Sequence, residues 1–236
     1  MNLPKEYTEK MKKLLGNEYD SYIESFSQPR YYGLRANTLK VTPDELTSMV
    51  DWKLEQVPWC KEGFYYDGEN VRPAKRPYYN AGLYYIQEPS AMSTGAMLNV
   101  EPGDRVLDLC AAPGGKSTQV AAKLKGQGII VSNDISASRC KALLKNIEVS
   151  GVPNCVITNE MPEKFPKFFN KIIVDAPCSG EGMFRKDDSA VKSWETHKTE
   201  MCCGLQREIL KYAADMLCDG GIIAYSTCTF APEEDE

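Results

Sequence analysis

The spacing of hydrophobic residues changes several times within the first third of the chain, which is typical of a small mixed module. Residues 3–26 carry apolar side chains at intervals of three and four, the period of a helix. Thr42-Pro43 combines a capping side chain with a proline suited to a first helical turn. The predicted elements are a helix over 3–26, a strand over 33–39, a helix from Thr42, and short strands over 52–57 and 63–66.

From Val100 onward, short apolar runs alternate regularly with amphipathic stretches. Such alternation predicts right-handed crossovers and a parallel sheet that helices cover on both faces. The predicted strands are 105–110, 128–133, 155–158, 171–174 and 221–225, and the predicted helices are 116–125, 137–150 and 199–217. The sequence therefore predicts an α/β protein with a doubly wound, mainly parallel, Rossmann-like domain.

These patterns divide the chain into three predicted segments. Residues 1–78 form the α+β module, and residues 79–99, with a helix over 91–98, connect it to the rest. Residues 100–236 form the Rossmann-like domain, whose fifth strand ends shortly before an acidic stretch at Glu233–Glu236.

Composition excludes several classes of protein. The 236 residues are 42% hydrophobic and 26% charged, which is ordinary for a soluble globular chain, and no apolar run reaches the length of a membrane span. The first residues are charged, so we expect no secretory signal. Nine cysteines without a C-x-x-C motif argue against a zinc site or a disulfide framework and favour a reducing cytoplasm. His197 is the single histidine and most simply a solvent-facing helix residue, so we expect no metal.

A net charge of −5 argues against a generally basic nucleic-acid-binding surface, although local basic patches remain compatible with it. The segment 72–79 combines Arg72, Lys75 and Arg76 with two tyrosines, and its prolines favour an extended chain. Composition alone favours a solvated linker here over a nucleic-acid contact.

Two cysteines follow two of the predicted strands. The strand 171–174 leads into Asp175 and Cys178, and the strand 221–225 leads into Cys228. Ligands of open α/β sheets bind at the carboxyl ends of the strands, and we expect both thiols at the end of a buried strand. Two thiols at one edge indicate covalent chemistry, whereas the alternative for a free cysteine is a small buried packing residue.

A glycine-containing loop joins the first strand of the Rossmann-like domain to its helix. Cys110 stands where a P-loop needs glycine, and the spacing of a dinucleotide loop is absent. Gly114 and Gly115 still allow a close backbone approach to a ligand, and the helix N-terminus favours an anionic group. Asp134, at the end of the second strand, suits the hydroxyls of a ribose. A ribose with a carboxylate and no pyrophosphate fits S-adenosylmethionine.

Three motifs of the chain together resemble the Nol/Nop/Sun family of RNA cytosine-5 methyltransferases, and most closely its bacterial 16S ribosomal RNA type. The motifs are Asp108–Lys116, Asp175–Gly180 and Tyr225–Thr229, and the segments 32–40, 85–92, 184–187 and 205–210 fit as well. The resemblance implies a class I methyltransferase domain. Members of the family continue past the position of Glu236 with a helix and two more strands, so we expect the chain to lack that C-terminal part and to end its sheet at the fifth strand.

The resemblance also implies a cofactor site for S-adenosylmethionine. The contact after the third strand is assigned to Asn159, with Glu160 as second choice, since many relatives carry Asp nearby. The implied cofactor-binding residues are Cys110, Ala111, Ala112, Pro113, Gly114, Gly115, Lys116, Asp134, Asn159 and Asp175. Cys110 is expected to pack within the loop and take no part in the chemistry.

The chemistry needs a nucleophile because carbon 5 of cytosine is unreactive in the intact ring. A thiolate that adds to carbon 6 makes carbon 5 enamine-like, so that it can accept the methyl group. Resemblance to the family assigns Cys228 as this nucleophile and Cys178 as the group that promotes release, while the residues alone permit the reverse. Asp175 is placed to hold the amino group or ring nitrogen of the cytosine.

Two alternatives remain at this point. DNA cytosine methyltransferases attack with a Pro-Cys cysteine that resembles Cys178, and a non-catalytic RNA-binding assembly factor would retain the cofactor loop without turnover. Under the favoured interpretation the partner is RNA, most simply 16S ribosomal RNA or the small ribosomal subunit, with no membrane and no metal. We expect a cytoplasmic monomer, with Arg72, Lys75 and Arg76 among the RNA contacts.

Overall fold

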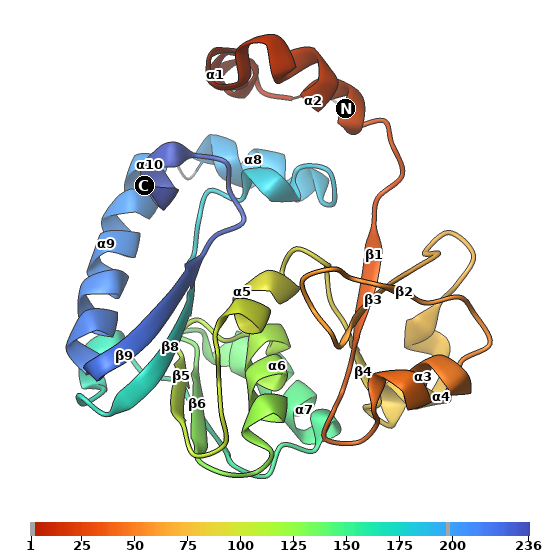
Figure 1. Ribbon diagram of the computed structural model, residues 1–236. Coiled ribbons are helices and arrows are strands. Elements are labelled where there is room, and N and C mark those ends of the chain that lie inside the picture. Colours follow the sequence, from red (N-terminus) through yellow and green to blue (C-terminus); the bar gives the residue numbers. More distant parts are fainter. Residues whose placement is uncertain (1–2, 197–198) are drawn as a thin grey trace. The chain divides into compact units, whose positions relative to one another are not determined.

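The computed structural model describes residues 3–196 and 199–236, and His197 lies outside these ranges (Figure 1). The larger sheet of the described part has five parallel strands in the order β7-β6-β5-β8-β9. They are β5 (Arg105–Asp108), β6 (Ile129–Asn133), β7 (Cys155–Thr158), β8 (Phe169–Asp175) and β9 (Leu217–Ser226). The strand order reverses at β5, as in other doubly wound sheets, so the predicted fold class is confirmed.

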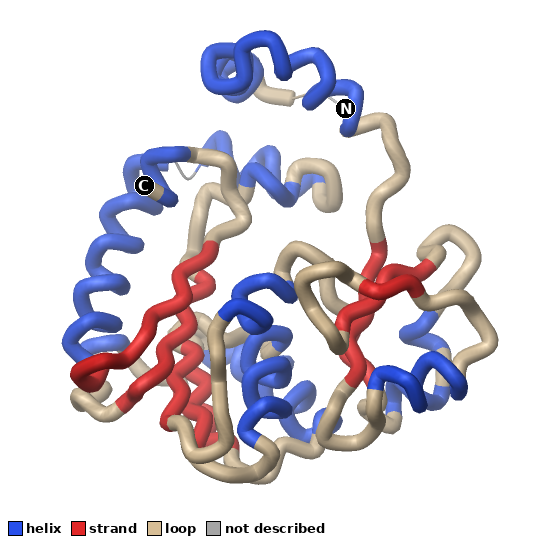
Figure 2. Tube along the Cα trace, in the orientation of Figure 1, coloured by secondary structure: helices blue, strands red, loops and turns tan. Residues whose placement is uncertain are grey.

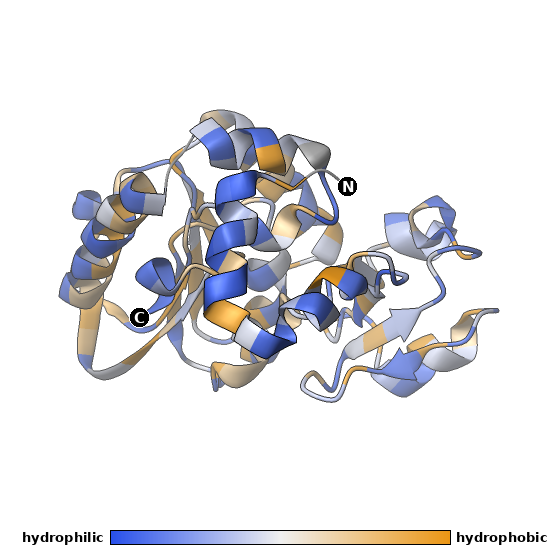
Figure 3. Ribbon diagram, turned by 90° about the horizontal axis from the view of Figure 1, so that it is seen from above, coloured by the Kyte–Doolittle hydropathy of each residue, from blue (hydrophilic) through white to orange (hydrophobic). Residues whose placement is uncertain are grey.

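Helices cover both faces of this sheet because successive strand residues point to opposite sides. Leu107 packs in one cluster with Met216 of α9 (Thr199–Met216), whereas its neighbour Val106 packs in another with Val120 of α6 (Gly115–Leu124). Figure 1 shows α6 and α9 on opposite sides of the strands. The helices in Figure 3 carry both hydrophobic and hydrophilic segments, as expected of helices that pack one face against a sheet and expose the other.

Further helices lie before, between and after these strands. Among the described residues, no helix is both long and apolar enough to cross a membrane. The further helices are α5 (Met92–Met97), α7 (Ala137–Ser150), α8 (Asp188–Thr196) and the short α10 (Pro232–Asp235), with 3₁₀ turns at Pro162–Lys164 and Glu181–Met183. The sequence pattern predicts α7 with its bounds and does not predict α8.

A second, antiparallel sheet has the order β2-β3-β1-β4 (Figure 2). Its helix α3 begins as predicted, with Thr42 and Glu45 forming a reciprocal capping box. Neither β4 nor the single turn α4 was predicted from the sequence, and β4 completes the sheet beyond residue 78. The elements are β1 (Tyr32–Ala36), α3 (Pro43–Met49), β2 (Glu55–Gln56), β3 (Gly63–Tyr66), a 3₁₀ turn at Pro73–Lys75, α4 (Pro77–Asn80) and β4 (Tyr84–Ile86).

Several predicted elements differ from the structure. The helix over 3–26 is two helices, because Gly16 adopts a positive φ of 53° where α1 ends. The strand over 52–57 contracts to β2. The last strand of the larger sheet is an edge strand and is not buried, since Ile222 on β9 remains 48% exposed. The N-terminal helices are α1 (Lys5–Leu15) and α2 (Tyr19–Ser25), joined by a 3₁₀ turn at Gly16–Glu18.

The chain folds into two compact units, each made of segments that are distant in the sequence. One unit comprises residues 31–176 and 209–226, with both sheets. The other comprises the residues up to Arg30 together with 177–208 and 227–236, and its core contains Tyr7 and Phe184. This grouping differs from the predicted segments 1–78, 79–99 and 100–236, whose bounds stay predictions about folding domains.

Side-chain hydrogen bonds join the segment after β1 to the C-terminus of α7 within the larger unit. The Asn37 side-chain amide donates to the backbone carbonyls of Gly82 and Ser150, at 2.8 Å each. The Lys40 ammonium donates to the carbonyl of Val149 at 2.7 Å, which places a cation at the C-terminus of α7. A cation there compensates the partial negative charge of the last helical carbonyls.

Substitution of Asn37 tests this junction. We expect Asn37→Ala to lower the free energy of unfolding by about 2–4 kcal/mol, because two buried carbonyls lose their donor. Chemical denaturation of the variant measures the loss. The matched control is Asn99→Ala, at an exposed asparagine, and equal stability of the two variants would contradict the assignment.

Candidate active site

The predicted cofactor loop leaves β5 at Asp108 and enters α6 at Gly115. Gly114 has a positive φ of 108°, a conformation that other residues rarely adopt, and a Cβ there would lie 3.1 Å from Leu143 Cδ1. The peptide bond between Ala112 and Pro113 is cis. The first N–H groups of a helix have no partner within the helix, so the start of α6 offers donors for an anionic ligand group.

Asp134 lies directly after β6, as predicted, and its carboxylate is engaged with the same loop. It accepts hydrogen bonds from the backbone N–H groups of Ala112 at 3.2 Å and Ser136 at 2.9 Å. Arg139 forms an ion pair with it at 3.2 Å. Asp134 is only 1% exposed, so its observed role is to tie the end of β6 to the cofactor loop, and its contact with a ribose stays a prediction.

Asn159 and Glu160 follow β7, and both are exposed. The Asn159 amide donates to the backbone carbonyl of Asp134 at 2.7 Å, whereas the backbone N–H of Glu160 donates to Asn133 Oδ1 at 2.9 Å. The structure thus brings both candidates beside the end of β6, and the choice of Asn159 as the adenine contact stays a prediction.

Asp108 is completely buried below the loop. Ser117 Oγ donates to its Oδ2 at 2.6 Å, and Ser132 Oγ donates to Ser117 Oγ at 2.9 Å. Burial is the main reason why the pKa of Asp108 rises from 3.8 to about 7. Burial, with the nearby carboxylates, also raises the pKa of Cys110 to about 12, so that Cys110 stays a thiol and fits a packing role.

Lys116 and Asp175 meet, although they come from different parts of the sequence. Lys116 Nζ lies 2.7 Å from Asp175 Oδ2, and Ser226 Oγ donates to Asp175 Oδ1 at 3.0 Å. The Asp175 side chain keeps 41% of its surface exposed, against 11% for Lys116. Asp175 is therefore a fixed carboxylate that remains available to a ligand.

The two cysteines singled out in the sequence are neighbours. Cys178 Sγ and Cys228 Sγ lie 3.2 Å apart, and the backbone N–H of Cys228 donates to Cys178 Sγ at 3.3 Å. Cys228 is exposed and Cys178 is partly buried. The hydrogen bond to Cys228 and then burial raise the pKa of the Cys178 thiol, so the second proton of the pair is held more tightly than that of an isolated thiol.

Hydroxyl and carboxylate groups join the two cysteine loops. Ser179 Oγ and Thr229 Oγ1, each next to one cysteine, lie 2.7 Å apart and are buried. Glu234 Oε2 accepts from the backbone N–H of Ser179 at 3.0 Å and from Gln206 at 2.8 Å. The separation of the two thiols is thus set by several buried contacts.

Sequence reasoning passed over Arg35, which is 2% exposed. Its guanidinium donates to the carbonyl of Gly115 at 3.1 Å, to Thr118 Oγ1 at 2.8 Å and to Gln87 Oε1 at 2.9 Å. Burial lowers its pKa to about 10. Arg35 thereby holds the start of α6 against β1. The signal available in the sequence was an arginine within a predicted strand.

The predicted RNA-binding cations differ in their surroundings. Arg76 forms an ion pair with Asp51 at 3.3 Å and lies 5.1 Å above the Trp52 ring, whereas Arg72 donates to the carbonyls of Gly68 and Val71. Lys75 is exposed. Their contact with RNA stays a prediction.

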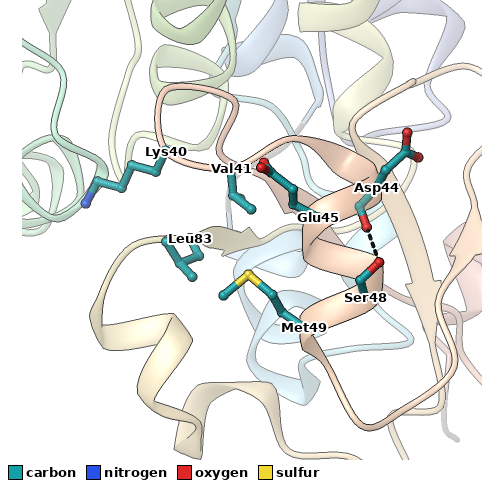
Figure 4. A pocket seen from close by; sticks show the side chains of 7 residues that line it. All are labelled: Lys40, Val41, Asp44, Glu45, Ser48, Met49 and Leu83. Carbon is teal, nitrogen blue, oxygen red and sulfur yellow. Dashed lines mark hydrogen bonds between the residues drawn. The ribbon is translucent and has the colours of Figure 1, made fainter.

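The cavities described in the structure lie beside the small sheet, away from the residues of the cofactor loop. One has a volume of about 340 Å³ and includes Arg72 and Lys75 in its wall. The other, of about 480 Å³, is an open groove along α3 whose wall includes two acids (Figure 4). Its lining residues are Lys40, Val41, Asp44, Glu45, Ser48, Met49 and Leu83. Within residues 3–196 and 199–236, no group of three metal-ligating side chains is arranged to hold a metal ion.

The strand order and the loop at the end of β5 define a Rossmann-like, class I methyltransferase domain. A crystal structure of a methyltransferase homologue from Pyrococcus horikoshii has this fold, with a TM-score of 0.84 and 31% identity over 98% of this chain and 75% of that one. The family model for 16S rRNA methyltransferase RsmB/F matches residues 95–236, and that for the N-terminal domain of 16S rRNA methyltransferase RsmF matches residues 3–89. The chain belongs to the RsmB/F family, as its motifs indicate.

Relatives named ribosomal RNA small subunit methyltransferase F are similar along most of the chain. That of Serratia proteamaculans is 40% identical over an alignment of 228 positions, which covers 92% of this chain and 48% of the relative. That of Escherichia coli is 39% identical over 230 residues, with the same coverage. The chain therefore spans about half the length of the curated relatives it matches.

The raised pKa of Asp108 predicts a pH-dependent stability. Between pH 4 and 7 the folded state binds the Asp108 proton more tightly than the unfolded chain, so stability falls as pH rises through this window. Asp108→Asn cannot ionise, and we expect its Tm relative to the unsubstituted protein to increase from pH 5 to 7.5. Thermal unfolding in matched buffers measures the difference. Asp20→Asn, at an exposed acid, is the control, and a Tm difference independent of pH would contradict the assignment.

Proposed function

We propose that this protein transfers a methyl group from S-adenosylmethionine to carbon 5 of a cytidine in RNA. The observation that carries the proposal is the 3.2 Å separation of Cys178 Sγ and Cys228 Sγ, which belong to two different motifs of the family. Membership of the RsmB/F family and the names of the curated relatives support ribosomal RNA of the small subunit as the substrate class.

The residues around the loop fit the proposed cofactor in their chemistry. The N-terminus of α6 suits a carboxylate, and we assign Asp134 and Asn159, at the ends of β6 and β7, to the ribose and the adenine. S-adenosylmethionine supplies an electrophilic methyl group when bound. Residues 110–116 would hold its amino-acid part, and Lys116 would hold the Asp175 carboxylate in place.

In the proposed reaction, the Cys228 thiolate forms a bond to carbon 6 of cytosine, and carbon 5 then takes the methyl group. Cys178 keeps its proton and donates it towards Cys228 Sγ, which stabilises the attacking thiolate. Water then takes the proton from carbon 5, and the electron pair of that C–H bond re-forms the double bond to carbon 6 and expels the Cys228 thiolate. We assign Cys178, still a thiol, to promote this step by donating a hydrogen bond to the departing sulfur. The Asp175 carboxylate is suited to accept a hydrogen bond from the cytosine amino group.

The proposed partner is single-stranded or locally opened RNA, because a cytosine must leave its stack to reach the thiols. We place the reaction in the cytoplasm, on 16S ribosomal RNA or the small ribosomal subunit, with a monomeric enzyme. Bisulfite sequencing of ribosomal RNA from a deletion strain would identify the position, because the target cytidine resists bisulfite conversion only while it is methylated.

Substitution of the two cysteines distinguishes their roles. Cys228→Ala should abolish methyl transfer to RNA and leave S-adenosylmethionine binding within about twofold, because it removes the nucleophile alone. Cys178→Ala should slow release and accumulate a covalent protein–RNA adduct. Labelled RNA on a denaturing gel measures the adduct, and Cys202→Ala is the matched control.

Other outcomes would support the alternatives. An adduct that forms only in Cys228→Ala would reverse the two roles. Methyl transfer to DNA and not to RNA would indicate the DNA enzyme, with Cys178 attacking. RNA binding without methyl transfer by the unsubstituted protein would favour a non-catalytic assembly factor.

A further inference from the structure

Glu181 is an acidic residue whose side chain is completely buried beside the two cysteine loops. Its Oε1 accepts hydrogen bonds from Lys10 Nζ at 2.7 Å and from Trp194 Nε1 at 3.0 Å. Its Oε2 accepts from the backbone N–H of Phe230 at 3.2 Å. A buried carboxylate is costly unless it is paired and hydrogen-bonded, and these donors meet both conditions.

The contacts of Glu181 and its neighbour reach the peptide groups around Cys228. Glu181 lies three residues after Cys178, and its partner Phe230 lies two residues after Cys228. The next residue, Gly182, donates its backbone N–H to the carbonyl of Cys228 at 2.8 Å. The chain around Cys228 is therefore held by the segment that follows Cys178.

The ion-pair partner of Glu181 comes from α1. Lys10 keeps 24% of its side-chain surface exposed, and its helix is fixed by Tyr7, which is fully buried. The Tyr7 ring packs at 4.9 Å from Phe184 and at 5.9 Å from Trp194, the residue that also donates to Glu181. The position of the carboxylate thus depends on α1 as well as on the two loops.

We infer that Glu181 and Lys10 are positioning residues that hold Cys228 at its reactive distance from Cys178. The inference rests on the proposed function, in which Cys228 is the nucleophile. Lys10 acts through Glu181, and Glu181 acts through the Phe230 peptide and the turn that begins at Gly182.

Substitution of Lys10 tests the inference without touching either cysteine loop. Lys10→Met leaves Glu181 buried without its cation, and we expect kcat for methyl transfer to fall about tenfold or more, because small displacements of a nucleophile slow catalysis strongly. KM for RNA and the affinity for S-adenosylmethionine should stay within about twofold. Lys10→Arg keeps the cation and should restore most of kcat. Lys13→Met, at an exposed lysine of the same helix, is the matched control.

If Lys10 only stabilised the fold, its substitution would slow methyl transfer through a loss of stability. A second comparison separates this structural role from the positioning role. Met11→Ala removes a buried side chain of the same cluster and leaves all donors to Glu181 in place. Assayed at a temperature where both variants are fully folded, Met11→Ala should keep kcat within about twofold, whereas Lys10→Met should not. Equal losses of kcat in the two variants would overturn the inference.

Gly182→Ala tests the positioning of Cys228 by a steric change that leaves the ion pair of Lys10 and Glu181 in place. An added Cβ would lie 2.9 Å from the carbonyl oxygen of Cys228, so the loop must shift. In a Cys178→Ala background, we expect both Gly182→Ala and Lys10→Met to slow formation of the covalent adduct about tenfold. Unchanged adduct formation in both, while Cys228→Ala forms none, would overturn the positioning role alone. Full methyl transfer by Cys228→Ala would overturn the proposed function together with this inference.

Discussion

The alignment of β8 with β9 is the constraint on which the arrangement of the thiols depends. In this parallel pair Asp175 lies opposite Ser226, so both strands end at the same level and their connecting segments leave from one edge of the sheet. Cys178 comes three residues after the first of these positions and Cys228 two residues after the second. A shift of one residue in the register would turn the side chains of one strand to the other face and separate the two segments. Contacts at the strand ends hold this register, because Ser226 Oγ donates to Asp175 Oδ1 at 3.0 Å and the backbone N–H of Ala176 donates to the carbonyl of Ser226 at 2.9 Å.

Beyond the ends of the strands, buried polar groups take over from hydrophobic packing. Asp134 binds the backbone of the cofactor loop, Arg35 binds the start of α6, and Glu181 binds the segment after Cys228. Each of these side chains contacts at least one backbone N–H or carbonyl group, and a hydrogen bond of this kind fixes a loop more closely than apolar contact does. Loops that carry chemistry need such fixation because they contribute few side chains to the core.

This division explains what the sequence could and could not predict. The five parallel strands and α7 were predicted from apolar runs and helical spacing, because the strands of a sheet covered on both faces are apolar at nearly every position. The neighbourhood of Cys178 and Cys228 also followed, since both lie just past strand ends. The pairing of β4 with β1 did not, because Tyr84–Ile86 is too short to show a period. The break of the N-terminal helix at Gly16 depends on one backbone conformation, which helical spacing alone does not reveal.

Local sequence patterns could not predict the long-range pairing of Lys10 with Glu181, for a different reason. Lys10 has the spacing of a solvent-facing lysine on an amphipathic helix, and Glu181 has that of an exposed acid in a glycine-rich turn. Only the packing of Tyr7 against Phe184 and Trp194 brings the helix to the turn and excludes water from the carboxylate. Once water is excluded, the cation becomes necessary, since the Trp194 and Phe230 donors alone leave a buried negative charge uncompensated. A hydrophobic cluster in the N-terminal helices therefore creates the electrostatic requirement that connects α1 to the reactive thiol.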